Sequence, residues 1–396
     1  MRSSGKDPLP DLPLTDPAFH AADPFDTYRR LRDESPVYWC ATGGFYALTR
    51  HEDVLTVSRD PATYRSGEGI AMRGGEMEVP GGVTLISTDP PKHASQRRLI
   101  NRSFTKGAIA KLEPHVRDIV REALDDAPVG EPFDFVETVA ARVPVIVIAE
   151  LLGVPVADRD KFVAWTNASV GTADPDFAHL QGTAMAEQLA YFEEIIGQRR
   201  AEPRGDLIST LIAAEAEHDD FSPHELNMLC LLLLGAGSET TRNLIAHGFV
   251  GLTRHPDQLA QLREGSDVAR VVEELLRWVS PLIHQARTVT TETELGGRDL
   301  VPGDQVVMLY GSANRDDRVF GQTAEDLDVT RDPNPHLAFG FGEHFCLGAA
   351  LARLEGRVLF EELTERFGQW SLAGPPERLR STMIRGIKRL PVVLSP

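Results

Sequence analysis

Apolar residues recur with the spacing of amphipathic helices over a long middle part of the chain, from Lys106 to about His218. The stretch Gln188–Gln198 is the clearest case, because its apolar residues stand three or four positions apart and share one helical face. They are Leu189, Phe192, Ile195 and Ile196. Two short helices are predicted nearer the start of the chain, at Phe25–Glu34 and Glu52–Arg59. Helices therefore dominate the predicted structure.

Strand patterns are confined to short pieces. Val37–Trp39 and Phe45–Thr49 are rich in aromatic and β-branched residues and are joined through two glycines, so they predict a β-hairpin. Another strand-like run begins at Arg287, and two more lie near the end of the chain, at Trp370–Leu372 and Pro391–Leu394. The β-structure is predicted to be the smaller part of the fold.

The sharpest helix start is Ser222–Glu225, where a serine is followed three positions later by a glutamate and Pro223 takes the first helical position. The run that follows predicts a helix of about thirty residues, to roughly Thr253, which is long for a globular domain. Its middle reads GAGSETT, although each interior glycine costs roughly 1 kcal/mol relative to alanine. We therefore expect Gly235 and Gly237 to let a flat group lie against this helix.

Composition limits the class of protein and its partners. The 396 residues contain no linker, low-complexity tract or repeat, so residues 1–396 are expected to form one domain, with residues 1–25 as an irregular arm. The net charge of −18 argues against nucleic acid as a partner. No apolar run is long enough to span a bilayer, and the polar, proline-rich N-terminus lacks the apolar core of a signal peptide. Three widely spaced cysteines give no disulfide framework. We expect a cytoplasmic protein without a membrane anchor.

Cys346 is the residue around which the candidate chemistry gathers. It stands in the sequence HLAFGFGEHFCLGAALARLE, between a glycine-rich, aromatic-flanked loop and a run that predicts a helix. A helix N-terminus favours a thiolate over a thiol through its dipole and its free N–H groups. Gly340, Gly342 and Gly348 allow unusual backbone angles or the close approach of something bulky. A thiolate with room for a large planar partner is typical of a cysteine-ligated haem.

Simpler interpretations of this loop remain open at this point. A lone cysteine in a glycine-rich turn is most often a buried structural residue. A zinc site is set aside because no C-x-x-C pair accompanies Cys346. Gly340 and Gly342 also lack the third glycine of a dinucleotide-binding fingerprint. A cysteine-nucleophile hydrolase would need a base near the sulfur, and His344 is the nearby candidate.

Phe339, Gly342, Cys346 and Gly348 match the signature F-x-x-G-x-x-x-C-x-G, and through it the chain resembles the cytochrome P-450 family of haem-thiolate monooxygenases. The resemblance implies a mainly α-helical domain with a smaller β-sheet region, haem b as the cofactor and Cys346 as its iron ligand. It places Phe339 near the sulfur and Gly348 against the haem. The implied reaction inserts one oxygen atom into an apolar substrate and reduces the other to water.

The middle of the long helix resembles the family as well, because residues 236–240 fit its motif A-G-x-[DE]-T. By position in that motif, Glu239 takes the acid role and Thr240 the alcohol role in delivering protons to dioxygen. Ala236 is expected to lie against the haem. A solvated helix face is the alternative for Glu239, although the four leucines just before it favour burial.

Four residues resemble the family's ligands of the haem propionates. His93 and Arg97 stand four positions apart at a predicted helix start and so share one face. An exposed basic turn is the alternative for this pair. The resemblance adds Arg287 and His344, and the four residues together are expected to neutralise the two carboxylates.

Glu274 and Arg277 resemble the family's E-x-x-R motif, a buried pair that supports the haem-binding core. Taken alone, such a pair is usually a surface ion pair of little energy. The family usually adds a second arginine downstream, but here Asp326 falls at about that position. Either another residue completes this network or the segment is held differently.

The resemblance also implies partners. No flavin or iron–sulfur motif is present, so electrons are expected from a ferredoxin and its ferredoxin reductase. The ferredoxin would dock on a positive face, although a scatter of surface cations is an equal alternative. The cations are Arg98, Arg102, Lys106, Arg353 and Arg357. A peroxide-driven peroxygenase and a haem protein that acts on carrier-tethered substrates are the alternative functions.

An apolar substrate such as a steroid, terpenoid, fatty acid or polyketide is expected. Gly67–Gly82, Asp174–Leu189 and Thr382–Ile387 resemble segments that surround the substrate in the family, although Gly67–Gly82 could also be a mobile surface loop. The residues suggested to line the pocket are Met72, Leu85, Leu233, Leu282, Ile283, Met383 and Ile384.

Overall fold

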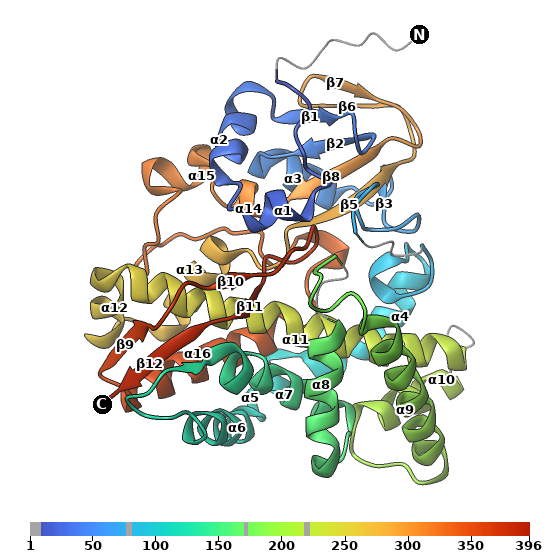
Figure 1. Cartoon of the computed structure of the whole chain (residues 1–396). Helices are drawn as coiled ribbons and strands as arrows, with labels where there is room; N and C mark the ends of the chain where they lie inside the picture. The colour runs from blue at the N-terminus through green and yellow to red at the C-terminus, as the bar shows by residue number, and fades with distance from the viewer. Residues whose placement is uncertain (1–8, 77–80, 170–172, 218–221) are drawn as a thin grey trace.

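The computed structural model describes residues 9–76, 81–169, 173–217 and 222–396. Long helices form the lower part of the molecule, and the main sheet with the first helices forms the upper part (Figure 1). The prediction of a mainly α-helical fold with a smaller β region is confirmed. Residues 1–8 of the predicted arm and Met77 of the predicted covering loop lie outside the described residues. Within the described ranges, no helix combines the length and apolarity that a membrane crossing requires.

The main sheet carries the predicted hairpin and Arg287. Its strands are β1 (Val37–Cys40), β2 (Phe45–Leu48), β8 (Gln305–Leu309), β5 (His284–Val289) and β3 (Tyr64–Arg65), in that spatial order. The hairpin prediction is confirmed, since β1 and β2 are antiparallel with Val37 opposite Leu48. β2 pairs in parallel with β8, and β8 pairs antiparallel with β5. Arg287 is thereby fixed on a central strand, opposite Val306.

Three smaller sheets complete the β-structure. They join β4 (Phe133–Asp134), β12 (Pro391–Ser395) and β9 (Gln369–Leu372), then β10 (Glu377–Arg378) with β11 (Ile387–Arg389), and β6 (Thr293–Leu295) with β7 (Arg298–Leu300). The strand-like pieces predicted near the end of the chain are β9 and β12, which pair antiparallel.

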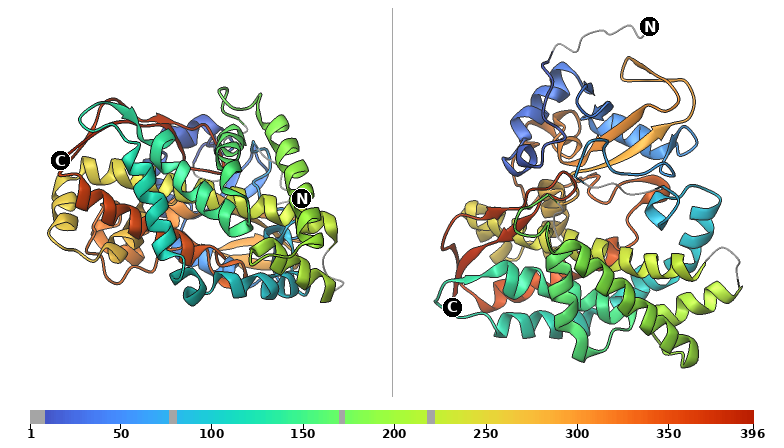
Figure 2. Two further views of the ribbon diagram at one scale, coloured as in Figure 1. Left: turned by 90° about the horizontal axis from the view of Figure 1, so that it is seen from below. Right: turned by 45° about the vertical axis from the view of Figure 1, so that its right-hand side comes forward.

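Helix α11 (Pro223–Arg254) runs through the middle of the helical part (Figures 1 and 2). Its 32 residues span about 48 Å at 1.5 Å per residue. The predicted start is confirmed: the Glu225 N–H donates to Ser222 Oγ at 3.2 Å, and the Ser222 N–H donates to the Glu225 carboxylate at 2.8 Å. The predicted amphipathic stretch lies within α9 (Gln181–Ala201), with Phe192, Ile195 and Ile196 buried.

Several other helices pack on α11. Those that pack directly on it include α7 (Arg142–Leu152), α9, α13 (Val268–Val279) and α16 (Ala349–Arg366). The others are α1 (Pro17–Ala21), α2 (Phe25–Glu34), α3 (His51–Arg59), α4 (Lys92–Asn101), α5 (Lys106–Ala110), α6 (Glu113–Asp125), α8 (Arg159–Ser169), α10 (Leu207–Glu217), α12 (Pro256–Arg263), α14 (Tyr310–Ala313) and α15 (Asp317–Phe320). The predicted helix at Phe25–Glu34 is α2, and the one at Glu52–Arg59 is α3.

Glu274 and Arg277 form a buried ion pair on α13, with neither side chain exposed (0 %/0 %). The alternative of a surface pair is therefore wrong. The second arginine is Arg331, whose Nε lies 3.2 Å from a Glu274 carboxylate oxygen. Asp326 is not a gap in the network, since its carbonyl oxygen accepts a hydrogen bond from Arg277 at 2.6 Å. Another residue thus completes the network, five positions beyond the one that the resemblance suggested.

Candidate functional site

Cys346 lies at the point where a tight loop turns into α16, as predicted. A short 3₁₀ turn, Gly342–His344, precedes it, and Gly348 caps the helix. The Cys346 N–H donates to the Phe339 carbonyl at 2.9 Å, which closes the loop on itself. The sulfur is thereby held at a fixed place beside the helix start.

Two glycines shape the loop through their backbone and a third through its missing side chain. Gly340 and Gly342 have φ of +67° and +74°, angles that residues with a Cβ adopt only at a cost. A Cβ on Gly342 would also lie 2.1 Å from the Ser58 carbonyl oxygen, so α3 requires glycine there. Gly348 has an ordinary φ of −81°, and a Cβ on it would meet nothing within 4 Å. Gly348 therefore borders open space, where a flat group can approach.

We infer a hollow between the cysteine loop and the middle of α11, because the side chains of Cys346 and Ala236 are exposed and a Cβ on Gly348 would meet nothing within 4 Å. The sulfur nevertheless lies deep within the protein, with many protein atoms around it. This enclosure raises the pKa of the Cys346 thiol, while the Gly348 N–H and the cations Arg97 and Arg353 act in the opposite direction. In the protein without a bound metal, the expectation that the helix start favours a thiolate is therefore wrong. Burial raises the pKa of the thiol by more than the helix start and the cations lower it. A bound metal cation would reverse that balance.

The middle of α11 forms another wall. The loop before α16 lies beside this part of α11 in Figures 1 and 2, and α16 packs on α11. Ala236 is exposed there, although Leu234 and Ser238 on either side of it are buried. One expectation is corrected: a Cβ on Gly237 would lie 3.1 Å from Ile148, so this glycine serves the packing of α7 and not a flat ligand.

The structure brings together the four residues predicted to bind propionates, from three separate elements. His93 and Arg97 come from α4, Arg287 from β5 and His344 from the turn before Cys346. The rings of His93 and His344 lie 4.2 Å apart. Arg97 donates to the Phe345 carbonyl, which ties α4 to the cysteine loop. The alternative of an exposed basic turn does not hold for His93, which is 2 % exposed.

The charges of this basic cluster (His93, Arg97, Arg287 and His344) favour the binding of an anion. Burial lowers the pKa of His93 to about 4 and that of His344 to about 2, and Arg97 and Arg287 add repulsion, so both rings are neutral at pH 7. Burial also lowers the pKa of Arg287, which forms no ion pair among the described residues. Buried cations are costly unless an anion accompanies them.

The donor set fits haem b. Arg97 and Arg287 match the two carboxylates of that group, and the buried His93 Nε2, which has no hydrogen-bond partner in the described chain, is free to donate to one of them. The cysteine sulfur, the bare Gly348 and the exposed Ala236 border the space for its ring.

His93, Glu343 and His344 also place donor atoms within 4.8 Å of one another, a spacing that would suit a divalent cation. The guanidinium groups of Arg97 and Arg287 act on the same histidines and would repel such a cation. A carboxylate ligand agrees better with these charges than a metal ion does.

Glu239 and Thr240 lie on α11, as the motif requires. The Thr240 hydroxyl donates to the Ala236 carbonyl at 2.9 Å, a bond back to the preceding turn of the helix. Burial raises the pKa of Glu239 to about 7, and Glu76 adds to this, while Arg242 lowers it. Glu239 is only partly exposed and burial dominates its pKa, which disfavours the alternative of a solvated helix face. At neutral pH this carboxyl is close to half-protonated, which suits a group that takes up and releases protons.

The three segments predicted to surround the substrate meet around residues 380–388. Ser381 donates to the Glu76 carboxylate, and the Glu76 N–H donates to Thr382 Oγ1 at 3.4 Å. Asp174 accepts from the Arg380 N–H at 3.1 Å and pairs with Lys388 at 3.2 Å. The described part of the first segment, residues 67–76, is thus tied down, which disfavours the alternative of a mobile surface loop. Most suggested lining residues are buried: Met72, Leu85, Leu233, Ile283 and Met383.

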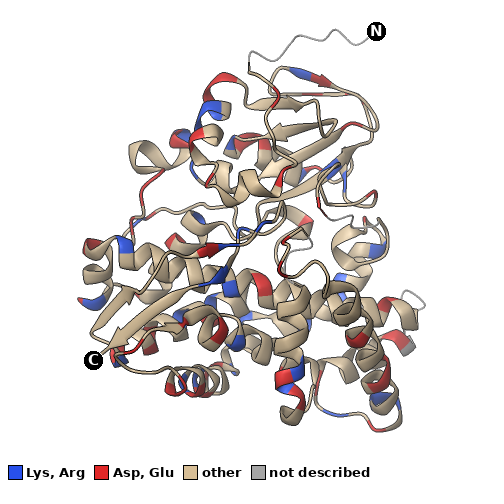
Figure 3. Cartoon of the chain, viewed as in Figure 1, with Lys and Arg blue, Asp and Glu red and all other residues tan. Residues whose placement is uncertain are grey.

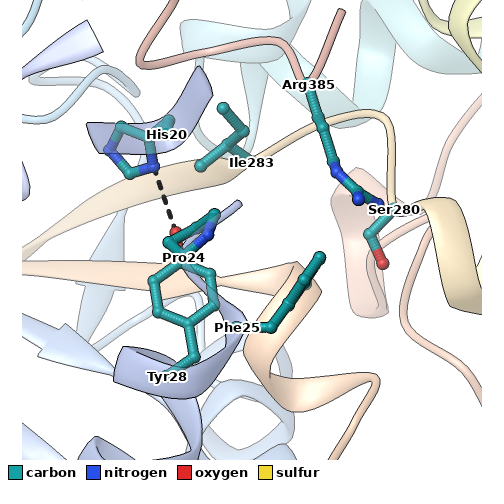
Figure 4. A pocket seen from close by; sticks show the side chains of 8 residues that line it. His20, Pro24, Phe25, Tyr28, Ser280, Ile283 and Arg385 are labelled. Carbon is teal, nitrogen blue, oxygen red and sulfur yellow. Dashed lines mark hydrogen bonds between the residues drawn. The ribbon is translucent and has the colours of Figure 1, made fainter. Parts of the chain in front are cut away.

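A small cavity lies elsewhere, between the N-terminal segment and the body of the protein (Figure 4). Its free volume of about 20 Å³ holds one water and no larger molecule. Arg385 stacks over Phe25 at 4.5 Å, and His20 is hydrogen-bonded to Tyr28 at 3.1 Å. We interpret this cavity as a structural joint that anchors the N-terminal segment.

The predicted positive face is smaller than expected. Arg353 is paired with Glu273 at 2.5 Å, and Arg357 is paired with Glu113 at 2.6 Å, so neither presents a free charge. Arg98, Arg102 and Lys106 are exposed, and no ion pair involves them among the described residues. Figure 3 shows basic residues on α4, at the right of the view.

Comparison with known proteins agrees with this geometry. The profile of the family named Cytochrome P-450 matches residues 183–384. Linalool 8-monooxygenase of Pseudomonas putida is 36% identical over 94% of this chain and 96% of its own. The methyl-branched lipid omega-hydroxylase of Mycobacterium bovis is 36% identical over 98% and 96%. A Bacillus megaterium protein solved in complex with testosterone superposes with a TM-score of 0.84, at 32% identity, over 94% of this chain and 98% of that one.

Proposed function

The chain belongs to the cytochrome P-450 family of haem b monooxygenases, and we propose that it inserts one oxygen atom from dioxygen into an apolar small molecule. A steroid, terpenoid, fatty acid or polyketide is the substrate class. The observation that carries the proposal is the exposed Cys346 just before α16, a helix that packs on α11, which carries Glu239 and Thr240. The relatives named for linalool and for methyl-branched lipid, and the neighbour bound to testosterone, support an apolar substrate.

Haem b with a thiolate ligand supplies the chemistry that activates dioxygen. Cys346 would hold the iron, and the N–H of Gly348 and the nearby Arg97 and Arg353 would stabilise the charge on its sulfur. His93, Arg97, Arg287 and His344 would hold the two carboxylates and fix the orientation of the ring. Phe339 is packed near the ligand loop, with its ring 6.2 Å from that of Phe345.

Glu239 and Thr240 move protons on the opposite side of the hollow. Because the Thr240 hydrogen is donated to the Ala236 carbonyl, the Oγ1 lone pairs remain available to accept from water or a protonated group. Glu239, with a pKa near 7, then gives a proton at Oε and recovers one from solvent. These two residues therefore serve the reaction that consumes dioxygen.

The proposal predicts a high-spin optical shift when the right class of apolar compound displaces water from the hollow. The purified protein is titrated with linalool, a methyl-branched fatty acid and testosterone, and compounds that shift the spectrum are turned over under ¹⁸O₂ with an electron donor. We expect product with one ¹⁸O atom. Shifts with none of the free compounds would contradict the proposal, and turnover with hydrogen peroxide alone would identify a peroxygenase instead. A shift only with carrier-tethered compounds would point to a biosynthetic assembly.

We propose a small acidic ferredoxin, reduced by its reductase, as the electron donor. The exposed cations Arg98, Arg102 and Lys106 support this, because they form a positive patch on a chain with a net charge of −18. Opposite charges at such a surface accelerate association.

Reversing Arg98 and Arg102 together to glutamate should slow reduction by ferredoxin about tenfold or more at low salt, since steering is lost. The effect should shrink as salt is added. Stopped-flow reduction measures it, and substrate-induced optical shifts should be unchanged. Reversing Arg29 and Arg30 together to glutamate is the matched control, because it makes the same charge change on the exposed face of α2, at the other side of the molecule (Figure 1). Equal rates in all three proteins would exclude docking at this patch.

A further inference from the structure

Arg242 is a buried cation one helical turn beyond Glu239 on α11. Its side chain is 4 % exposed, and its Nη1 donates to Asn167 Oδ1 of α8 at 2.9 Å. Burial lowers the pKa of Arg242 to about 10, so it stays charged at neutral pH. No carboxylate lies within ion-pair distance of it among the described residues. Two negative groups act on it from farther away, Glu239 and Asp134.

Two buried polar atoms, one on α11 and one on α8, have no protein partner in the described chain. They are Nε of Arg242 itself and Oγ1 of Thr166, the residue before Asn167 on α8. Both residues are 4 % exposed. Buried polar groups are almost always hydrogen-bonded, and where protein does not supply the partner, an ordered water does. The interface of α8 and α11 therefore fits bound water beside Arg242.

Glu239 faces a specific set of charged groups. Arg242 comes from its own helix and stabilises the carboxylate, while Glu76, from the segment that covers the hollow, opposes it. Within the described ranges, the Glu239 carboxyl has no protein hydrogen-bond partner, whereas the Glu76 carboxyl is held by Ser381. The Glu239 carboxyl therefore has no protein partner that would compete with a bound water.

We propose that Arg242 is a positioning residue for proton delivery, and that its guanidinium and the Thr166 hydroxyl hold the water that supplies Glu239. This inference rests on the proposed monooxygenase function. The cation attracts the water oxygen and turns the hydrogens toward the carboxylate. Each proton that Glu239 gives to the site is replaced through this water from solvent, so the carboxyl returns to its starting state without net change.

The first test needs neither substrate nor turnover. Infrared difference spectra against Glu239→Gln identify the C=O band of protonated Glu239, and its amplitude is followed from pH 5 to pH 9. In Arg242→Gln the midpoint should move up by about one unit, because an opposite charge is lost near the carboxyl. Arg242→Lys should restore the wild-type midpoint. Arg254→Gln, an exposed arginine at the end of the same helix, should leave it unchanged. An unchanged midpoint in Arg242→Gln would overturn the role of Arg242.

The second test addresses the water. Thr166→Val keeps the shape of the side chain but removes the hydroxyl, and Thr166→Ser keeps the hydroxyl. With a compound that is turned over, Thr166→Val should lower product formed per dioxygen consumed and raise the solvent isotope effect, while Thr166→Ser retains the wild-type values. Equal values in both variants would overturn the water route. Because the infrared midpoint is read in the resting protein, it stays informative if no substrate is found, so failure here is distinct from failure of the proposed function.

Discussion

Replacing Cys346 with serine should abolish the red-shifted Soret band of the reduced, carbon-monoxide-bound protein and reduce monooxygenase activity to background. A serine hydroxyl stays protonated where a thiol bound to iron loses its proton, so the strong electron donor is removed. The backbone around the position is fixed by the Cys346 N–H bond to Phe339 and by the start of α16, so serine fits without rearrangement. The absorbance spectrum before and after addition of carbon monoxide measures the effect.

Cys40→Ser is the control for this variant. Cys40 is buried in the main sheet, on a different element from the cysteine loop, and its sulfur makes a weak contact with the Leu12 carbonyl at 3.9 Å. This variant should keep the wild-type spectrum even if it is somewhat less stable. A Cys346→Ser protein that still shows the thiolate band would exclude Cys346 as the ligand, whereas loss of the band in both variants would point to general unfolding.

Local chemistry explains why parts of the fold could be predicted from sequence. The start of α11 depends on Ser222 and Glu225 alone, and both bonds of that capping box are present. The β1–β2 hairpin likewise depends on alternating apolar residues and a glycine turn. For Gly237, sequence alone predicts the wrong reason for the glycine. The pattern predicts that glycine is needed there, but only the position of Ile148 shows that the reason is helix packing.

The arrangement of the site could not be predicted from short stretches of sequence, because it depends on contacts between residues far apart in the chain. The spacing of His93 and Arg97 predicts a shared face, but their meeting with Arg287 and His344 follows from the packing of α4, β5 and the cysteine loop, and only resemblance anticipated it. Glu76 and Arg242 were missed. A signal for Arg242 existed, since an arginine inside the apolar run after Thr241 is unusual for a buried helix.

Replacing Glu274 with glutamine should lower the free energy of unfolding by about 3–5 kcal/mol, because it leaves two buried arginines without their shared carboxylate. The Glu274 carboxylate accepts from Arg277 at 2.7 and 2.8 Å and from Arg331 at 3.3 and 3.2 Å. It also accepts from Asn334 and from the Asp328 N–H. Glutamine has the same shape but turns one acceptor into a donor facing guanidinium groups. Denaturant unfolding of the haem-loaded protein measures the loss.

Asp326→Asn is the control for Glu274→Gln. It tests whether the loss of stability comes from the unpaired arginines or from any change of charge in the segment around residue 326. Asp326 stands where the resemblance placed the second arginine, but its side chain is exposed and it enters the network only through its carbonyl oxygen. Asparagine keeps that carbonyl, so the change should stay within about 0.5 kcal/mol. Arg331→Gln should be intermediate, because Arg277 keeps its carboxylate while the bonds from Arg331 to the carbonyls of Phe320 and Thr323 are lost. If Asp326→Asn destabilised the protein as much as Glu274→Gln, the segment would owe its stability to surface charge, and the assignment of Arg331 as the second arginine would be wrong.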